Sequence, residues 1–441
     1  VGQAADKALL DVGRITYTNN GQASVLVSAT GLGTVLRLAG AITDSSADSG
    51  HIVRTQTNSL LYADTGYTFT RTGNLTSNDV GNYGQILRND KLHILNFDAA
   101  SHTVSVQNPL TSSTNITLSS AADAAKLALT LHTHGAVSGV NGITGNQYNK
   151  LLSATITLTG DIDLQGSGVE QFTPANEREV FFKGKILGNG NILTLAIGES
   201  SRTKEGEDAN VGILNDGVNM RYFMGAFSGL SGATVEKVTV AGDLKHYADA
   251  PIGFFFGGLA GYAKHTSITI KDCTSNVNIT LAEGTAKASI YVGGFLGSIQ
   301  ENTVVSITGS TTNAAINLRS GYGIQAVYLG GVVGRVTIKT NKEVAFTNNT
   351  ISASITQNVN ATNAHVGGCF GDLVCNNYIS VDMTGTKAVN ASVTSASSAS
   401  AGGLIGHTVQ RCKLVLDGAW QGTVSSGNAS VGGLIYDLDG K

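Results

Sequence analysis

The sequence feature that most limits the fold is a five-residue pattern, Gly-Gly-x-x-Gly, that recurs through the second half of the chain. Successive copies begin about 36 residues apart, and a shorter step leads to a final Gly-Gly pair. Units of this length are typical of solenoids, propellers and arrays, in which neighbouring units stack to bury apolar faces. The repeated glycines are Gly257, Gly258, Gly261, Gly293, Gly294, Gly297, Gly330, Gly331, Gly334, Gly367, Gly368, Gly371, Gly402, Gly403, Gly406, Gly432 and Gly433.

Each unit contains three strand signals. The glycine segment is followed by two β-branched runs bounded by turn residues, such as 267–270 and 277–280, and the pair recurs at 304–307 and 315–318. Apolar and small polar residues alternate in these runs, as strands with one buried face require. We therefore predict an all-β fold: a right-handed parallel β-helix with three strands per rung over residues 151–441. The missing fourth strand signal and the lack of a blade-closing aromatic count against a propeller.

The paired glycines need a physical reason, because glycine inside a strand loses side-chain packing and raises the entropy of the unfolded chain. Either the backbone bends there with positive φ, or another segment approaches closely. Both causes would recur at the same corner of every rung. We therefore expect the glycines to be structural and not part of a ligand-binding loop.

A helix is expected at the front of the array, over residues 116–129, with Ser119 or Ser120 as its cap. Its apolar residues fall on one stripe, so we expect it to cover the open end of the first rung. With its connector it forms a segment of residues 116–150. Residues 1–115 are β-rich but do not follow the glycine register, which predicts a separate small β domain or irregular leading rungs.

The composition suits a protein whose surface is made of sheets and turns. Hydrophobic residues make up 41% of the chain and charged residues 13%, so Ser, Thr, Asn and Gly must cover most of the surface. The 28 basic and 31 acidic residues give a net charge of -3 without a basic cluster, so no nucleic-acid partner is expected. No apolar run approaches the roughly 20 residues that cross a bilayer, so no membrane span is expected.

Four cysteines are too few to form a disulfide framework. Cys369 stands where other repeats have Leu or Val, which predicts a buried free thiol. Cys375 and Cys412 occupy similar places in successive repeats, but their offsets from the preceding Gly-Gly pair differ. This difference favours unbonded thiols, with a disulfide as the alternative.

From the helix onward, the order of segments resembles bacterial surface proteins that carry the GLUG motif, a repeat close to Gly-Leu-hydrophobic-Gly. Residues 155–164 are similar to the family's opening strand "LTxDIDL", and residues 182–192 are similar to its "FxGxFDGNGxxI" stretch. Residues 224–227 correspond to "GLFG" and precede the Gly-Gly repeats. Phe172 stands where the family has Trp, and Leu187 where it has Asp.

This resemblance covers roughly residues 116–441 and implies an extracellular or cell-surface β-helix. Similar regions occur in adhesin-like proteins and in the non-catalytic parts of secreted metallopeptidases. The leading hypothesis is a non-catalytic structural or adhesive module, a rigid rod that spaces a binding tip or itself contacts a host or microbial glycan or protein. No cofactor is expected.

A carbohydrate-active enzyme, a polysaccharide lyase or glycosidase, is one alternative, because parallel β-helices host both classes. Such an enzyme needs paired carboxylates on one face of the rungs. The candidates read more simply as turn-stabilising or solvated groups, so no catalytic, cofactor or metal residue is assigned. The groups considered are Asp161 and Asp163, the loop residues Glu170, Glu177, Arg178 and Glu179, and the histidines His132 and His134.

The ends of the chain suggest another alternative. The sequence opens at Val1 without Met and stops at Lys441 soon after a Gly-Gly pair, so we expect it to be a piece of something longer. The array ends without a polar cap, which leaves a strand edge able to template another chain. The third hypothesis is a filament or surface-layer subunit that self-associates through this C-terminal edge.

Overall fold

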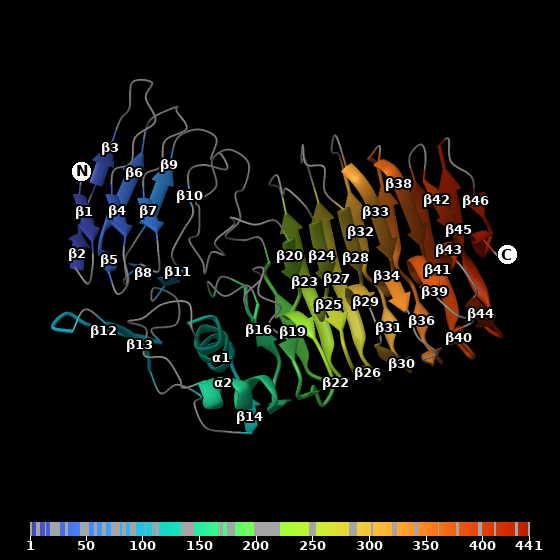
Figure 1. The fold of residues 1–441 in the computed structure, drawn as a ribbon, viewed down its shortest axis with the longest axis horizontal. Coiled ribbons are helices and arrows are strands. Elements are labelled where there is room, and N and C mark those ends of the chain that lie inside the picture. The colour runs from blue at the N-terminus through green and yellow to red at the C-terminus, as the bar shows by residue number, and fades with distance from the viewer. Residues whose placement is uncertain are drawn as a thin grey trace.

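The computed structural model describes the chain from residue 114 as a parallel β-solenoid (Figure 1), which confirms the predicted fold class. Neither helix in the described part of the chain has the length and apolarity that crossing a membrane requires. The described residues are 114–133, 145–165, 167, 171–173, 181–197, 221–246, 253–281, 289–300, 303–319, 324–338, 343–359, 361–375, 379–395, 399–409, 412–427 and 431–439, and before 114 chiefly the strands.

Each full turn of the coil adds a strand to each of four parallel sheets, which we number in chain order within a turn. Sheet 1 contains β20 (Arg221–Met224), β24 (Gly253–Gly257), β28 (Ser289–Gly293), β33 (Ile324–Gly330), β38 (Ala361–Gly367), β42 (Ser400–Gly402) and β46 (Val431–Gly432). Sheet 2 contains β17 (Phe181–Phe182), β21 (Phe227–Leu230), β25 (Ala260–Lys264), β29 (Leu296–Gln300), β34 (Val333–Ile338), β39 (Phe370–Cys375), β43 (Ile405–Val409) and β47 (Ile435–Asp439).

The other two sheets complete the turn. Sheet 3 contains β14 (Asn115–Leu118), β15 (Thr155–Leu158), β18 (Lys185–Leu187), β22 (Thr234–Glu236), β26 (Ser267–Lys271), β30 (Val304–Thr308), β35 (Val344–Thr347), β40 (Ile379–Asp382) and β44 (Cys412–Val415). Sheet 4 contains β16 (Ile162–Asp163), β19 (Ile192–Leu195), β23 (Thr239–His246), β27 (Thr274–Leu281), β31 (Thr311–Thr312), β32 (Ala315–Leu318), β36 (Thr350–Ile351), β37 (Ser354–Gln357), β41 (Lys387–Ser395) and β45 (Trp420–Ser426).

The rung has four strands where three were predicted, because the glycine segment forms two strands instead of one. In one turn, β24 ends at Gly257 and β25 begins at Ala260, so the chain changes sheet at the Gly-Gly pair. The predicted register of the repeat is correct: Gly257 pairs with Gly293, and the pairing continues through every later copy. The segment 224–227, which precedes the Gly-Gly repeats, follows the same register, since Met224 pairs with Phe256.

Close approach of backbone, and not positive φ, explains the paired glycines. A Cβ on Gly257 would lie 2.6 Å from the carbonyl oxygen of Phe295, and one on Gly258 would lie 2.6 Å from that of Gly294. Real Cβ atoms do not approach backbone oxygen so closely. Positive φ is used instead where sheets 3 and 4 meet, at one residue per turn: Lys237, Asp272, Gly309, Asn348 and Gly385.

The core is a continuous stack of inward-facing side chains. Ile268 and Ile270 on β26 and Val277 and Ile279 on β27 are each at most 1% exposed. A further inward column follows the Gly-Gly pairs and confirms Cys369 as a buried free thiol. Burial raises the pKa of this thiol well above its ordinary value. The column consists of Leu259, Phe295, Val332, Cys369 and Leu404.

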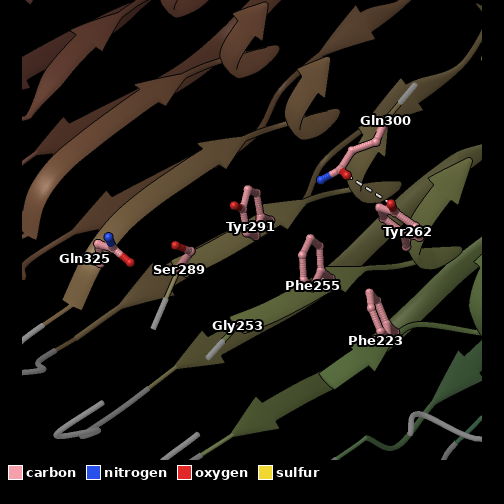
Figure 2. A pocket seen from close by; sticks show the side chains of 8 residues that line it. All are labelled: Phe223, Gly253, Phe255, Tyr262, Ser289, Tyr291, Gln300 and Gln325. Atoms are coloured by element: carbon pink, nitrogen blue, oxygen red, sulfur yellow. Dashed lines mark hydrogen bonds between the residues drawn. The ribbon is translucent and has the colours of Figure 1, made fainter. Parts of the chain in front are cut away.

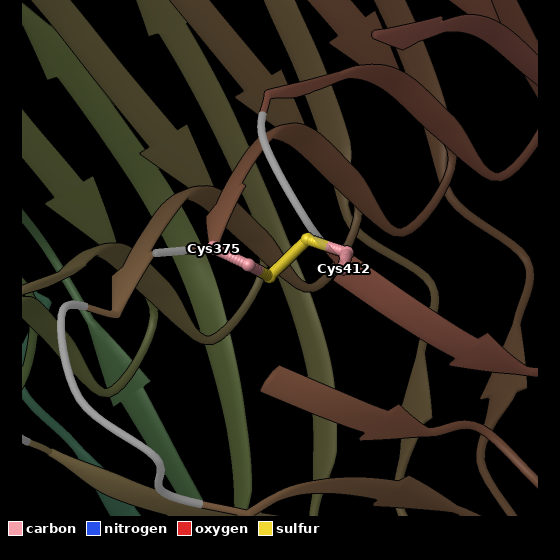
Figure 3. The surroundings of a disulfide bond; sticks show 2 residues. All are labelled: Cys375 and Cys412. Atoms are coloured by element: carbon pink, nitrogen blue, oxygen red, sulfur yellow. A yellow bond between two sulfur atoms is a disulfide. The ribbon is translucent and has the colours of Figure 1, made fainter. Parts of the chain in front are cut away.

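A disulfide joins Cys375 and Cys412, contrary to the favoured prediction (Figure 3). Their offsets from the glycines differ because Cys375 ends a strand of sheet 2, whereas Cys412 begins a strand of sheet 3 in the next turn. The bond crosses the corner between these sheets, with the two Cα atoms 5.3 Å apart. It therefore ties two successive rungs together.

Two helices lie in the chain between β14 and β15 of sheet 3: α1 (Ala121–Thr133) and α2 (Gly145–Leu152). The helix begins later than predicted, because residues 115–118 pair with β15 as the first strand of sheet 3. Ser120 is the cap, since its Oγ accepts a 3.2 Å hydrogen bond from the backbone nitrogen of Asp123. Leu127 and other apolar residues of α1 are buried in the same core cluster as the first rungs, where the helix was expected to pack.

The leading region contains parallel rungs with a shorter period. Its strands recur about every 26 residues and form three sheets of parallel strands. These are β1 (Gly2–Ala5), β4 (Val27–Thr30), β7 (Val53–Gln56) and β10 (Val80–Gly81); β2 (Leu9–Val12), β5 (Val35–Leu38), β8 (Leu60–Ala63) and β11 (Gln85–Arg88); and β3 (Ile15–Tyr17), β6 (Ala41–Asp44) and β9 (Thr68–Arg71). An antiparallel pair, β12 (Leu95–Asp98) and β13 (Thr103–Val106), follows.

The last described rung exposes apolar side chains. Val431 is 44% exposed and Leu434 is 39% exposed, whereas Leu404, one turn earlier at the position of Leu434, is 6% exposed. The Trp420 ring lies beside Gly368 and Gly403, at the Gly-Gly corners of two successive turns. Self-association through this edge stays a prediction, which a monodisperse monomer at high protein concentration would contradict.

Candidate functional site

The outer faces of sheets 1 and 2 face each other across the Gly-Gly corner. Phe254 and Phe256 point into the core, whereas Phe255 belongs to a separate outer cluster with Tyr262 of sheet 2. The rings of Phe255 and Tyr262 lie 5.6 Å apart, so side chains from the two sheets meet outside the coil. We call this line of facing side chains along the solenoid axis the glycine groove.

Two columns of side chains line the glycine groove. Backbone pairing aligns the outer column of sheet 1 from turn to turn, and does the same for the column of sheet 2. The first column is Phe223, Phe255, Tyr291, Tyr328 and His365, and the second is Tyr262, Ser298, Arg335, Asp372 and His407. The groove therefore changes along its length from aromatic and uncharged to charged.

The sheet 1 column is a continuous ring stack. Its centroids are 4.8 Å apart between Phe223 and Phe255, 4.4 Å between Phe255 and Tyr291, and 5.0 Å between Tyr291 and Tyr328. Stacked aromatic pairs add stability beyond the area that they bury. Because each ring covers the face of its neighbour, the stack presents mainly ring edges and hydroxyl groups to the groove.

A pocket of about 190 Å³ opens in the aromatic part of the groove (Figure 2). The hydroxyl of Tyr262 donates a 3.0 Å hydrogen bond to Oε1 of Gln300, one rung further along sheet 2. Phe255 and Tyr262 are buried. The accessible part of the lining therefore consists of one aromatic residue, Tyr291, and the polar residues Ser289, Gln300 and Gln325. The lining residues are Phe223, Gly253, Phe255, Tyr262, Ser289, Tyr291, Gln300 and Gln325.

The charged end of the groove is built around Asp372, whose side chain is 3% exposed. Its Oδ2 lies 3.0 Å from Nε of Arg335, a contact of opposite charges without the alignment of a hydrogen bond. Its Oδ1 lies 2.8 Å from Nδ1 of His407. The Arg335 guanidinium also lies 4.6 Å from the Tyr328 ring centroid. Since these residues stand on successive strands of sheet 2, one carboxylate holds three rungs together.

His365 ends the ring stack and contacts the charged cluster. Its ring lies 4.1 Å from that of His407, and the two planes are 12° apart. Burial lowers the pKa of His365 to about 4, so this imidazole is neutral at pH 7. Its Nδ1 is buried without a hydrogen-bond partner.

Of the residues considered from sequence, the structure describes the side chains of Asp161 and Asp163, and neither lies in the groove. Asp161 accepts a 2.8 Å hydrogen bond from the backbone of Ile192, and Asp163 accepts one of 2.9 Å from the backbone of Gln165. Both carboxylates therefore stabilise backbone turns. Glu170, Glu177, Arg178, Glu179, His134 and the side chain of His132 lie outside the described residues.

The residues on which the GLUG resemblance rests have structural places in the coil. Phe172 is buried and stacks on Phe227, with ring centroids 5.1 Å apart. Asn189 and Gly190 have φ values of 55° and 87°, which asparagine and glycine adopt more readily than other residues. Leu187 ends β18 beside this turn.

The residues that line the groove recur at fixed distances from the Gly-Gly pairs in the sequence. Counted from the first glycine of each pair, the residue two positions earlier is Phe255, Tyr291, Tyr328 or His365 in successive repeats. The residue five positions later is Tyr262, Ser298, Arg335, Asp372 or His407. Only the division of the glycine segment into two sheets brings these two columns together.

Comparison with known proteins adds no relative. No family model, no curated protein and no solved structure matches this chain.

Proposed function

We propose that this chain is a non-catalytic adhesive module of a cell-surface protein, a β-solenoid rod that binds a neutral glycan in the glycine groove. The observation that carries the proposal is the pocket beside the ring stack. There, Tyr291, Ser289 and Gln300 are only partly buried and Gln325 is exposed, around a volume of about 190 Å³. Pockets that combine aromatic walls with a few directed polar groups are typical ligand sites.

The chemistry of the lining favours a sugar. A sugar offers many hydroxyl groups, which can pair with the amides of Gln300 and Gln325 and with the hydroxyls of Ser289 and Tyr291. None of the eight lining residues carries a formal charge. The nearby Arg335 guanidinium is already engaged by Asp372, so a neutral glycan is the better match than an acidic polysaccharide.

The sheet 4 side of the coil suits a spacer. Its polar side chains pair with one another from turn to turn: Asn278 donates a 3.0 Å hydrogen bond to Asp243, and Asn313 donates one of 2.8 Å to Asn276. Such paired ladders keep a solvated surface while adding contacts between rungs. They support the role of a stiff rod that holds its groove away from an anchoring surface.

The disulfide supports an extracellular location. Disulfides such as Cys375–Cys412 persist in oxidising compartments and are rare in the cytosol of most organisms. Antibody labelling of intact cells of the producing organism tests this location. Labelling only after the cells are permeabilised would contradict it.

A glycosidase is the second candidate, favoured by one feature of the backbone register. Asp372 pairs with His407, which pairs with Asp437, so the two aspartates stand two strands apart, or about 9–10 Å. Inverting glycosidases use two carboxylic acids, and this register supplies two aspartates in line on sheet 2. The burial of Asp372 and its contacts with Arg335 and His407 weigh against this role. Release of reducing ends that Asp372→Asn abolishes would establish it.

Glycan-array screening, followed by calorimetry with the best neutral oligosaccharide, tests the adhesive proposal. Tyr291→Ala and Gln300→Ala are expected to weaken binding at least about tenfold, a loss of roughly 1.4 kcal/mol. Thr356→Ala, on the outer face of sheet 4, is the matched control and is expected to bind like the unaltered protein. Failure of every neutral glycan to bind, or equal binding by all variants, would overturn the proposal.

A further inference from the structure

We infer that His365, Asp372 and His407 form a binding site for a divalent transition-metal ion, Zn²⁺ or an ion of similar preference. One ligand atom from each residue lies within 4.8 Å of the others. The three come from β38, β39 and β43, so a bound ion would link two rungs of the coil. The site is separate from the glycan pocket, whose lining includes none of the three.

The donor set indicates the class of ion. Two imidazole nitrogens and one carboxylate oxygen suit Zn²⁺ and its neighbours, whereas Mg²⁺ and Ca²⁺ prefer oxygen ligands alone. Three protein ligands leave a fourth position of a tetrahedral ion for water. Cys369 is not a further ligand, because its side chain belongs to the inward core column.

The unpartnered nitrogen of His365 is an independent observation that points to a ligand. The residue is 7% exposed, and its Nδ1 makes no hydrogen bond. A buried polar atom without a partner costs about 1–3 kcal/mol, so such atoms are rare in folded proteins. Coordination to a metal ion would give this nitrogen its partner.

Binding requires a local rearrangement that the geometry defines. Zn²⁺ bonds of about 2.0–2.2 Å place any two ligand atoms at most about 4.4 Å apart, so a cluster spread over 4.8 Å must contract slightly. The two imidazole rings are nearly parallel, so one ring must turn before both lone pairs point at one ion. The His407 side chain, at 17% exposure, is the less confined of the two. Its Nδ1 already lies 2.8 Å from Oδ1 of Asp372, within the spacing of two ligands on one ion.

Arg335 supplies the specific test. Its guanidinium lies against Asp372, so it repels a bound cation and competes for the carboxylate. The amide of a glutamine at this position keeps a hydrogen-bond donor without the charge. Arg335→Gln is therefore expected to bind Zn²⁺ several-fold more tightly than the unaltered protein, which a purely structural cluster would not do.

The experiment is a Zn²⁺ titration of the full chain after removal of bound metal, followed by calorimetry and thermal unfolding. We expect one Zn²⁺ more per chain in the unaltered protein than in His365→Ala or His407→Ala, and a Zn²⁺-dependent rise in Tm that both variants lose. His265→Asn, at an exposed histidine outside the cluster, is the control. Circular dichroism without metal establishes that each variant folds. Equal Zn²⁺ stoichiometry in the unaltered protein and both histidine variants, or weaker binding by Arg335→Gln, would overturn the site.

Discussion

The backbone nitrogen of Gly258 donates a 3.0 Å hydrogen bond to the carbonyl oxygen of Gly294, and a Cβ on Gly258 would lie only 2.6 Å from that oxygen. The second glycine of each pair therefore continues the ladder of hydrogen bonds around a corner too tight for a side chain. That corner directs the outer faces of sheets 1 and 2 toward each other. The groove is thus a consequence of the repeat itself.

Gly258→Ala is expected to destabilise the solenoid by roughly 1–3 kcal/mol or more, because the added methyl meets backbone and the core side chains of Val240 and Val277. Thermal unfolding followed by circular dichroism measures the loss. Gly160→Ala is the matched control, since the nearest atom to its added Cβ lies 3.7 Å away. Equal melting temperatures for the two variants would contradict steric exclusion at the corner.

Reducing the Cys375–Cys412 disulfide is expected to lower stability by roughly 3–4 kcal/mol, the chain-entropy value for a loop of this length. The bond closes a sequence separation of 37 residues and joins successive rungs. Unfolding with and without reductant measures the effect. The double variant Cys375→Ser/Cys412→Ser should unfold at the reduced protein's temperature and ignore reductant. A reductant effect that persists in the double variant would assign the sensitivity elsewhere.

Stability of the metal-free protein is expected to fall as the pH drops from about 6.5 through 4. Burial holds the folded pKa of His365 at about 4, below its ordinary value of 6.5, so in this window the unfolded chain binds more protons. Asp372 partly offsets this shift, whereas His407 and Arg335 reinforce it. The free energy of unfolding is expected to fall by on the order of 3 kcal/mol over this whole pH window.

Urea unfolding at a series of pH values, with a chelator present, measures this slope. His365→Phe should reduce it, because phenylalanine continues the ring stack without a titrating group. An unchanged slope in His365→Phe would show that other groups cause the acid sensitivity.

The sequence predicted the parts of the fold that depend on periodicity. The glycine spacing specified which residues pair between turns, and the alternation in runs such as 267–270 specified which side chains face the core. The fourth sheet escaped prediction because apolar residues continue through the Gly-Gly pair, so the segment reads as one strand. The predicted helix includes the residues of strand β14 because their short alternating run lies directly before a strong helix signal.

The groove could not be predicted from any single motif. Phe255 and Tyr262 read as ordinary strand residues until the corner between them is known. Cys375 and Cys412 likewise stand at different distances from the preceding Gly-Gly pair, which would separate them if both belonged to one sheet. They belong to two sheets that meet at a corner. In each case the missing information was the angle of the chain at a corner, which residue periodicity does not encode.

Saturation-transfer NMR with the strongest neutral oligosaccharide ligand tests the glycine groove most directly. Saturating aromatic protons of the protein should transfer magnetisation to the bound sugar, and Tyr291→Ala should remove most of this transfer while weakening binding about tenfold or more. Thr356→Ala should leave both unchanged. Undiminished transfer and affinity in Tyr291→Ala, or their loss in Thr356→Ala, would contradict binding in the groove.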